Sequence, residues 1–139
     1  MKNNILTSLI AFLWILSFSC CDDKNEAEDI QANLVGTWQL TSVQIDGVSV
    51  DIAAHPGFIR LQENKIFLSY HAATQVLIRG GWSYEGNMLN ISTDLPVAYY
   101  VLKADGKTLS LKRQDFNADG KLSTTIRDYQ RTADSQIPE

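Results

Sequence analysis

The chain has 139 residues, of which 45% are hydrophobic and 20% are charged, so its size and composition fit one globular domain. Its 16 acidic and 12 basic residues leave a formal charge of −4, without the excess of Lys and Arg that binding a phosphate backbone requires. The two cysteines, Cys20 and Cys21, are adjacent and form neither a disulfide framework nor a four-cysteine zinc site. We therefore expect no nucleic-acid partner and no cofactor.

Residues 1–19 are typical of a bacterial secretory signal peptide. Lys2 supplies a positive start, and the apolar run 5–18 is shorter than the about 20 residues that a membrane-spanning helix needs. Leu16-Ser17-Phe18-Ser19-Cys20 is similar to a lipobox, in which the cysteine receives the lipid. We expect Cys20 to be lipidated and to anchor the protein to a membrane. A plain signal peptide with two incidental cysteines is the alternative.

Acidic residues gather directly after these cysteines. Residues 22–29 contain five acids and one Lys, whereas residues 30–139 are close to neutral. Self-repulsion predicts that residues 20–32 form an extended, disordered tether between the lipid and the domain. Residues 30–35 are either a short helix or an ordered lead-in.

The body of the chain alternates short β-type segments with tight turns. Asp46-Gly47 follows the first segment and is the strongest short-range hairpin signal. No amphipathic segment is long enough for a crossover helix, which excludes a parallel sheet. Because closure removes both edges of an antiparallel meander, we expect an all-β, eight-stranded antiparallel up-and-down barrel. The predicted strands cover residues 37–45, 58–62, 65–71, 76–84, 88–92, 97–103, 108–113 and 122–131.

The first predicted strand carries two apolar pairs on opposite faces. Trp38 and Leu40 share one face by alternation, and Val43 and Ile45 share the other. Both pairs can face the barrel interior only if an extra residue resets the alternation between them. The pattern therefore predicts a β-bulge near residues 41–42.

Both ends of this body resemble lipocalin-like domains. Residues 34–40 contain Gly36-x-Trp38, which is similar to the opening of those domains, and residues 129–131 (Tyr-Gln-Arg) are similar to their closing strand. Together with the lipobox and the acidic run, these motifs resemble the small lipocalin-like lipoproteins of the Bacteroidota. The resemblance covers residues 33–132 and implies a lipocalin-like barrel.

The resemblance also implies a location and a contact. It implies a lipid-anchored protein of the cell envelope, at the outer membrane. The acidic run resembles a surface-export signal, which implies exposure at the cell surface; a solvated spacer without such a signal is the alternative. By the same resemblance, Trp38 packs against Arg131 and closes the bottom of the barrel. Arg127 lies on the same strand face and is the other candidate for this contact. Residues 133–139 follow as a C-terminal tail.

Groups for catalysis or metal binding are sparse. The chain beyond the signal has no Gly-x-Ser-x-Gly or Ser-x-x-Lys motif and no cysteine available as a nucleophile. His55 and His71 lack a cluster of partner ligands and are expected at the surface or the rim. Residues 115–120 mimic half of a calcium loop, but Ile126 replaces the final carboxylate, which favours a hairpin turn. We expect no catalytic residue, no metal site and no enzyme activity.

Aromatic residues on successive strands are the best candidates for a ligand site. Inside a small barrel they either fill the core or line a mouth that takes an apolar or planar ligand. The function expected first is a non-enzymatic binding module for a small apolar ligand. The alternative is a filled barrel that docks on another envelope protein or a glycan. The candidate ligand-binding residues are Phe67, Tyr70, Trp82, Tyr84 and Tyr99.

Overall fold

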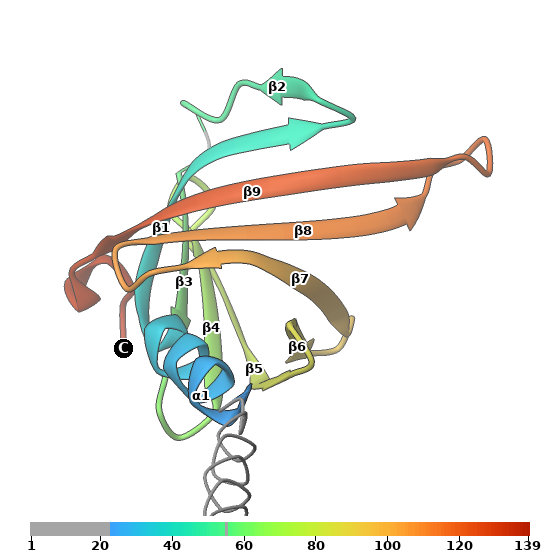
Figure 1. Cartoon of the computed structure of the whole chain (residues 1–139). Coiled ribbons are helices and arrows are strands. Elements are labelled where there is room, and N and C mark those ends of the chain that lie inside the picture. Colours follow the sequence, from blue (N-terminus) through green and yellow to red (C-terminus); the bar gives the residue numbers. More distant parts are fainter. Residues whose placement is uncertain (1–22, 55) are drawn as a thin grey trace, which may run out of the picture.

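A computed structural model describes residues 23–54 and 56–139, which form a closed antiparallel barrel with a helix at one end (Figure 1). The elements are α1 (Asp23–Leu34), β1 (Gly36–Ile45), β2 (Val48–Val50), β3 (Gly57–Leu61), β4 (Ile66–His71), β5 (Val76–Glu85), β6 (Met88–Ser92), β7 (Val97–Ala104), β8 (Thr108–Phe116), β9 (Leu122–Thr132) and the short 3₁₀ helix η1 (Asp134–Gln136). The strand order is β2-β1-β3-β4-β5-β6-β7-β8-β9, and an added β1–β9 pairing closes the barrel. The predicted signal peptide, Cys20, Cys21 and His55 lie outside the described residues.

The eight-stranded antiparallel barrel predicted from the sequence is confirmed, with β1 and β3–β9 as its strands. The three-residue strand β2 was missed. It pairs with the second half of β1, from Val43 opposite Val50 to Ile45 opposite Val48. β2 has room there because β3 pairs only with the first four residues of β1.

The predicted bulge in β1 is confirmed. The register of β1 against β9 shifts between Leu40 and Ser42. Trp38 before the shift is fully buried and Val43 after it is 9% exposed, so the extra residue keeps both on the inner face. Ile45 is 43% exposed because the strand has by then reached the open end of the barrel.

The N-terminal segment differs from the extended tether that its charge predicts. Asp23–Leu34 is an α-helix, and its last turn is fixed to the barrel. Leu34 is fully buried, its carbonyl accepts a hydrogen bond from Trp38 Nε1 at 2.9 Å, and Asn33 Nδ2 donates to the Ala104 carbonyl at 3.2 Å. Repulsion between the acidic residues favours an extended chain, but the burial of Leu34 stabilises the helical end of the segment.

The C-terminal residues fold back onto the outside of the barrel. Ile137 is 2% exposed and packs with Phe58 and Leu68 on the outer face of β3 and β4. The Asp134 carboxylate accepts a hydrogen bond from Thr37 Oγ1 at 2.5 Å. The segment expected as a tail therefore covers part of the barrel wall.

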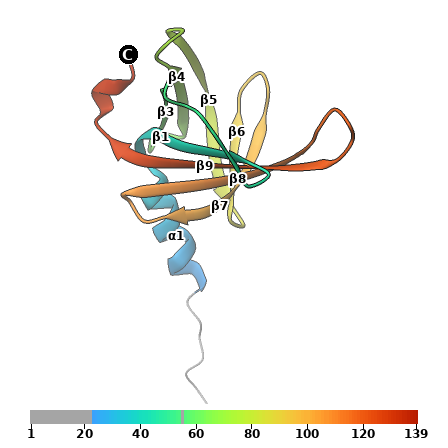
Figure 2. The ribbon, with the colours of Figure 1, turned by 90° about the horizontal axis from the view of Figure 1, so that it is seen from above.

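The main core fills the end of the barrel at which α1 lies. From above, β1, β8 and β9 cross the direction of β3, β4 and β5, so the two groups of strands face each other across the interior (Figure 2). Alternate residues of these strands point inward, as the burial of Leu109 and Leu111 on β8 illustrates. The cluster consists of Leu34, Trp38, Ile59, Leu61, Phe67, Trp82, Leu89, Ile91, Leu109, Leu111 and Tyr129.

Candidate functional site: a cavity beyond the barrel core

Trp38 and Arg131 meet at the end of the barrel next to α1. The guanidinium carbon lies 4.8 Å from the centre of the Trp38 ring. Arg131 Nη2 donates to the Val35 carbonyl at 2.8 Å, and Nε donates to the Gly106 carbonyl. One side chain of β9 therefore covers the indole and ties it to the start of β1 and to the β7–β8 turn. The structure brings together the two residues named for barrel closure.

Gly36 gives the Gly-x-Trp pattern a physical reason. Its φ of +146° is one that side-chain-bearing residues rarely adopt. A Cβ atom at this position would overlap the guanidinium of Arg131. The glycine thus leaves the space in which Arg131 covers Trp38.

A cavity of about 320 Å³ lies beyond the core, toward the opposite end of the barrel. This volume is at the lower end of the roughly 300–1,000 Å³ typical of small-molecule pockets. The barrel interior is therefore part packed core and part cavity. The residues that line it are Leu40, Gly57, Phe58, Ile59, Phe67, Ser69, His71, Leu89, Ile91, Tyr99, Leu111, Arg127 and Tyr129.

Two of the five candidate ligand-binding residues line this cavity. Phe67 on β4 is 8% exposed, and Tyr99 on β7 contributes a phenol from another wall. Tyr70 lies instead on the outer face of the barrel, packed against the cluster that contains Phe58. Its neighbour Ser69 points inward and lines the cavity, as strand alternation requires.

Trp82 and Tyr84 lie in or against the core and do not line the cavity. Trp82 is 4% exposed, and its Nε1 donates to the Gln62 carbonyl at 2.9 Å. The Lys65 ammonium lies 4.0 Å from the centre of the Trp82 ring. Trp82 also lines a separate, more open hollow of about 520 Å³. The Tyr84 hydroxyl donates to Asn87 Oδ1 at 3.0 Å, and burial raises the pKa of its phenol. Trp82 is therefore part of the core cluster, and Tyr84 packs against that cluster.

Arg127 is the cavity residue that the sequence analysis did not include among its ligand-binding candidates. It was considered only for barrel closure, yet alternation with Tyr129 places it on the inner face of β9. Its Nη1 donates to the Tyr99 hydroxyl at 2.9 Å, and its guanidinium carbon lies 5.7 Å from the Tyr99 ring centre. The signal that could have found it is a charged residue at an inward position of a barrel strand.

The neighbouring charge on β8 is neutralised. Arg113 Nε lies 2.5 Å from Asp115 Oδ2, and its Nη2 donates to Asp115 Oδ1 at 2.9 Å. The hydrogen bond to Asp115 raises the pKa of Arg113, with a smaller contribution from Tyr99. Tyr129, buried beside the cavity, has a phenol pKa raised by its burial.

The segment that mimics half of a calcium loop is a hairpin turn, as the sequence analysis favoured. It joins β8 to β9, and Asn117 Oδ1 accepts hydrogen bonds from the backbone N–H groups of Asp119 and Lys121 at 3.0 and 2.9 Å. Within residues 23–54 and 56–139, no three His, Cys, Asp or Glu side chains gather closely enough to hold a metal ion. In the same part of the chain, no helix combines the length and apolarity needed to cross a bilayer.

A closed antiparallel barrel, shut at one end by a Trp–Arg contact and hollow toward the other, defines a binding barrel of the lipocalin type. The model of the lipocalin-like domain family matches residues 34–111, more than half of the chain, and the chain belongs to that family. The match ends within β8, and β9 then closes the barrel against β1. No curated protein matches the chain closely enough to serve as a relative. The family is generally one of non-enzymatic binding domains.

Proposed function

We propose that this protein is a lipid-anchored lipoprotein of the cell envelope whose barrel binds a small apolar ligand. The observation that carries the proposal is the cavity of about 320 Å³, whose walls include Phe67, Leu89, Ile91 and Leu111. A barrel that acted only by docking would be expected to fill its interior. The cavity therefore supports the ligand-binding function over the interaction module.

The anchoring part of the proposal rests on the lipobox that ends at Cys20. α1 begins at Asp23, only three residues after Cys20, the residue expected to carry the lipid. A helix of 12 residues is about 18 Å long, so the barrel would stand close to the membrane with its Trp38 end toward it. The cavity would then face away from the lipid, toward an outside source of ligand.

Native mass spectrometry of the full-length protein, purified from its own host, tests ligand binding. We expect a bound molecule of defined mass that Ser69→Phe displaces, because Ser69 lines the cavity and a phenyl ring there would take up part of its volume. Ser49→Phe is the matched control, since Ser49 lies exposed on β2. Equal occupancy in wild type and Ser69→Phe would show that any bound molecule sits elsewhere.

Fatty-acid labelling tests the anchor. Cys20→Ser should abolish the label and release the protein from membranes or leave it unprocessed, whereas Cys21→Ser should remain labelled and anchored. Stable anchoring is expected because the several acyl chains of a lipoprotein exceed the marginal hold of one chain. A label that follows Cys21 would contradict the assignment to Cys20.

A further inference from the structure

Arg127 places a positive charge at a cavity that has no compensating carboxylate. The residues that line the cavity include no Asp or Glu among the part of the chain the structure describes. The ion pairs between described side chains are Arg60–Asp134, Lys103–Asp105 and Arg113–Asp115, and none involves Arg127. Arg127 is half-buried beside apolar walls and has no carboxylate partner, an arrangement that favours an anion supplied from outside.

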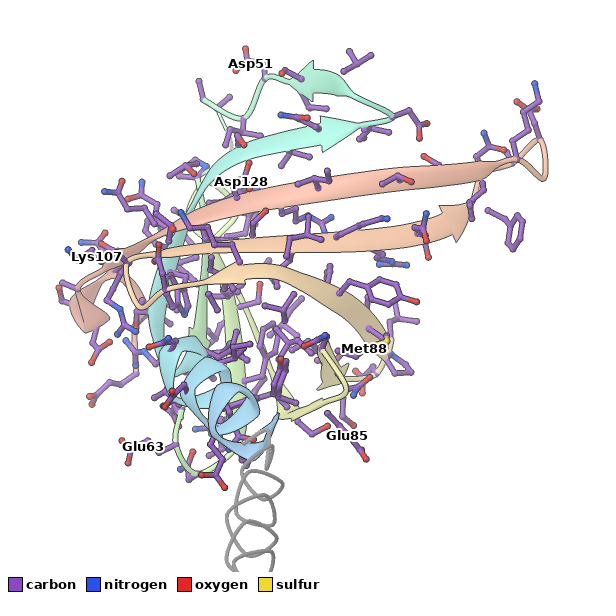
Figure 3. All side chains as sticks on the ribbon, viewed as in Figure 1. Asp51, Glu63, Glu85, Met88, Lys107 and Asp128 are labelled. Carbon is purple, nitrogen blue, oxygen red and sulfur yellow. The ribbon has the colours of Figure 1, made fainter. Side chains whose placement is uncertain are left out.

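The carboxylate next to it in sequence cannot serve. Asp128 projects from the opposite face of β9, where it lies between β1 and β8 (Figure 3). There it accepts hydrogen bonds from Ser42 Oγ at 2.7 Å and from Ser110 Oγ at 2.6 Å. Asp128 thus joins three strands on the outside and does not supply a carboxylate to Arg127 inside.

Tyr99 holds the guanidinium in place from β7. Arg127 Nη1 donates to the Tyr99 hydroxyl, which uses one of the five N–H donors of the guanidinium. The phenol can in turn donate its own proton to a further acceptor. A guanidinium fork together with a phenol is suited to the oxygens of a carboxylate or phosphate.

We propose that the cavity binds an amphipathic molecule with an anionic head, which Arg127 and Tyr99 hold, and an apolar body that lies against Phe67, Leu89 and Leu111. This inference rests on the proposed ligand-binding function and specifies the chemical class of the ligand. The head is a carboxylate or a phosphate, since both present oxygens to the same donors.

Two matched dyes test the inference on the full-length protein in nanodiscs, with the signal of empty discs subtracted. Anilinonaphthalene sulfonate carries an anionic group, and phenylnaphthylamine has the same aromatic units without it. We expect Arg127→Gln to weaken binding of the sulfonate by roughly tenfold to a hundredfold, the range for a hydrogen bond to a charged group, and to leave phenylnaphthylamine unchanged. Arg79→Gln, on the exposed outer face of β5, is the control and should leave both affinities at the wild-type value.

Displacement of the sulfonate dye identifies the head group. Decanoate and decyl phosphate should displace it from the wild-type protein more strongly than decanol does, and their order distinguishes a carboxylate from a phosphate ligand. Displacement by decanol as strong as by either anion would overturn the anionic-head inference.

The outcomes separate the inference from the function beneath it. If both dyes bind and a folded Arg127→Gln variant binds them as the wild type does, the ligand-binding function stands and the head-group inference is wrong. If neither dye binds the wild-type protein, both are wrong. Should Arg127→Gln fail to fold, Tyr99→Phe decides, because it keeps the ring and removes only the hydroxyl. It should weaken binding of the sulfonate dye alone, by several-fold, and unchanged binding would overturn the proposed Arg127–Tyr99 site.

Discussion

Arg131 joins three parts of the chain that are far apart in the sequence. Its side chain covers Trp38 and donates to carbonyls of Val35 and Gly106, so it contacts the start of β1 and the β7–β8 turn from the end of β9. The planar guanidinium stacks and donates in several directions at once, which the ammonium of lysine cannot do.

Arg131→Lys should therefore destabilise the barrel. We expect a loss of about 0.5–2 kcal/mol in the free energy of unfolding, the range for a cation–π contact, measured by urea denaturation. Arg79→Lys on the exposed face of β5 is the matched control and should stay within about 0.5 kcal/mol of wild type. Equal effects at both positions would show that the contact over Trp38 does not add to the free energy of unfolding.

Gly36→Ala should be costly for two reasons, backbone strain and overlap with Arg131. Gly47→Ala separates them, because Gly47 also has positive φ, +81°, but has open space around its Cα. We expect the free energy of unfolding to fall more for Gly36→Ala than for Gly47→Ala. In an Arg131→Ala background the cost of Gly36→Ala should shrink, since the overlap is gone. Strict additivity of the two substitutions would contradict the overlap.

Tyr129 makes stability depend on pH in alkaline solution. Burial raises the pKa of its phenol in the folded state above the value near 10 of an unfolded chain. Above about pH 10 the unfolded chain loses this proton while the folded chain keeps it, so the free energy of unfolding falls as pH rises. Tyr129→Phe should flatten this alkaline decline in denaturation series, with Tyr100→Phe, on an exposed side chain, as the control. An unchanged slope would contradict the assignment.

At the scale of elements, α1 acts as a cap on one end of the barrel. Leu34→Ala should lower the free energy of unfolding by about 2–5 kcal/mol, because Leu34 is fully buried in the core cluster. The control is Leu95→Ala, at a residue that is 84% exposed, with an expected change within about 0.5 kcal/mol. Similar small effects at both positions, measured by urea denaturation, would mean that the helix is not part of the barrel core.

The elements that sequence predicted well are those whose signal is local. β1 and β3–β9 are each rich in strand-forming residues and lie next to a turn signal, so they were found without knowledge of their neighbours. β2 was missed because three exposed residues carry too little pattern, and it forms only where β3 leaves β1 unpaired. The end of α1 was one of two alternatives for residues 30–35, and the rest of the helix was missed because the burial of its last residue depends on the barrel, which local composition does not describe.

At the scale of the molecule, closure joins all the barrel strands, and we expect the barrel to unfold as one cooperative unit. β1 and β9 pair along most of their length, and the residues of the main cluster come from α1 and seven of the barrel strands. In a chain processed at Cys20, fluorescence would report on Trp38 and Trp82, which lie in this cluster. We expect its denaturation midpoint to coincide with that of far-ultraviolet circular dichroism. Separate midpoints would show that part of the barrel unfolds alone.

The candidate ligand-binding residues divide between the cavity and the core. Aromatic residues on successive strands were expected either to fill the core or to line a ligand site, and Phe67 and Tyr99 line the cavity. Trp82 satisfies the same sequence criteria but lies in the packed part of the barrel. Alternation determines which face of a strand a residue occupies. The position along the barrel axis at which the packed core ends and the cavity begins depends on all the strands together.

The sequence by itself determined the strands, the antiparallel meander, the bulge in β1 and the hairpin at residues 115–120, because each depends on neighbours a few residues apart. Only the tertiary structure decided that a cavity remains, that Arg127 faces it without a carboxylate, and that Leu34 fixes α1 to the barrel end. These depend on the volume that strands distant in sequence enclose. Packing and pairing of that kind are set by the closed barrel, and no short stretch of residues encodes them.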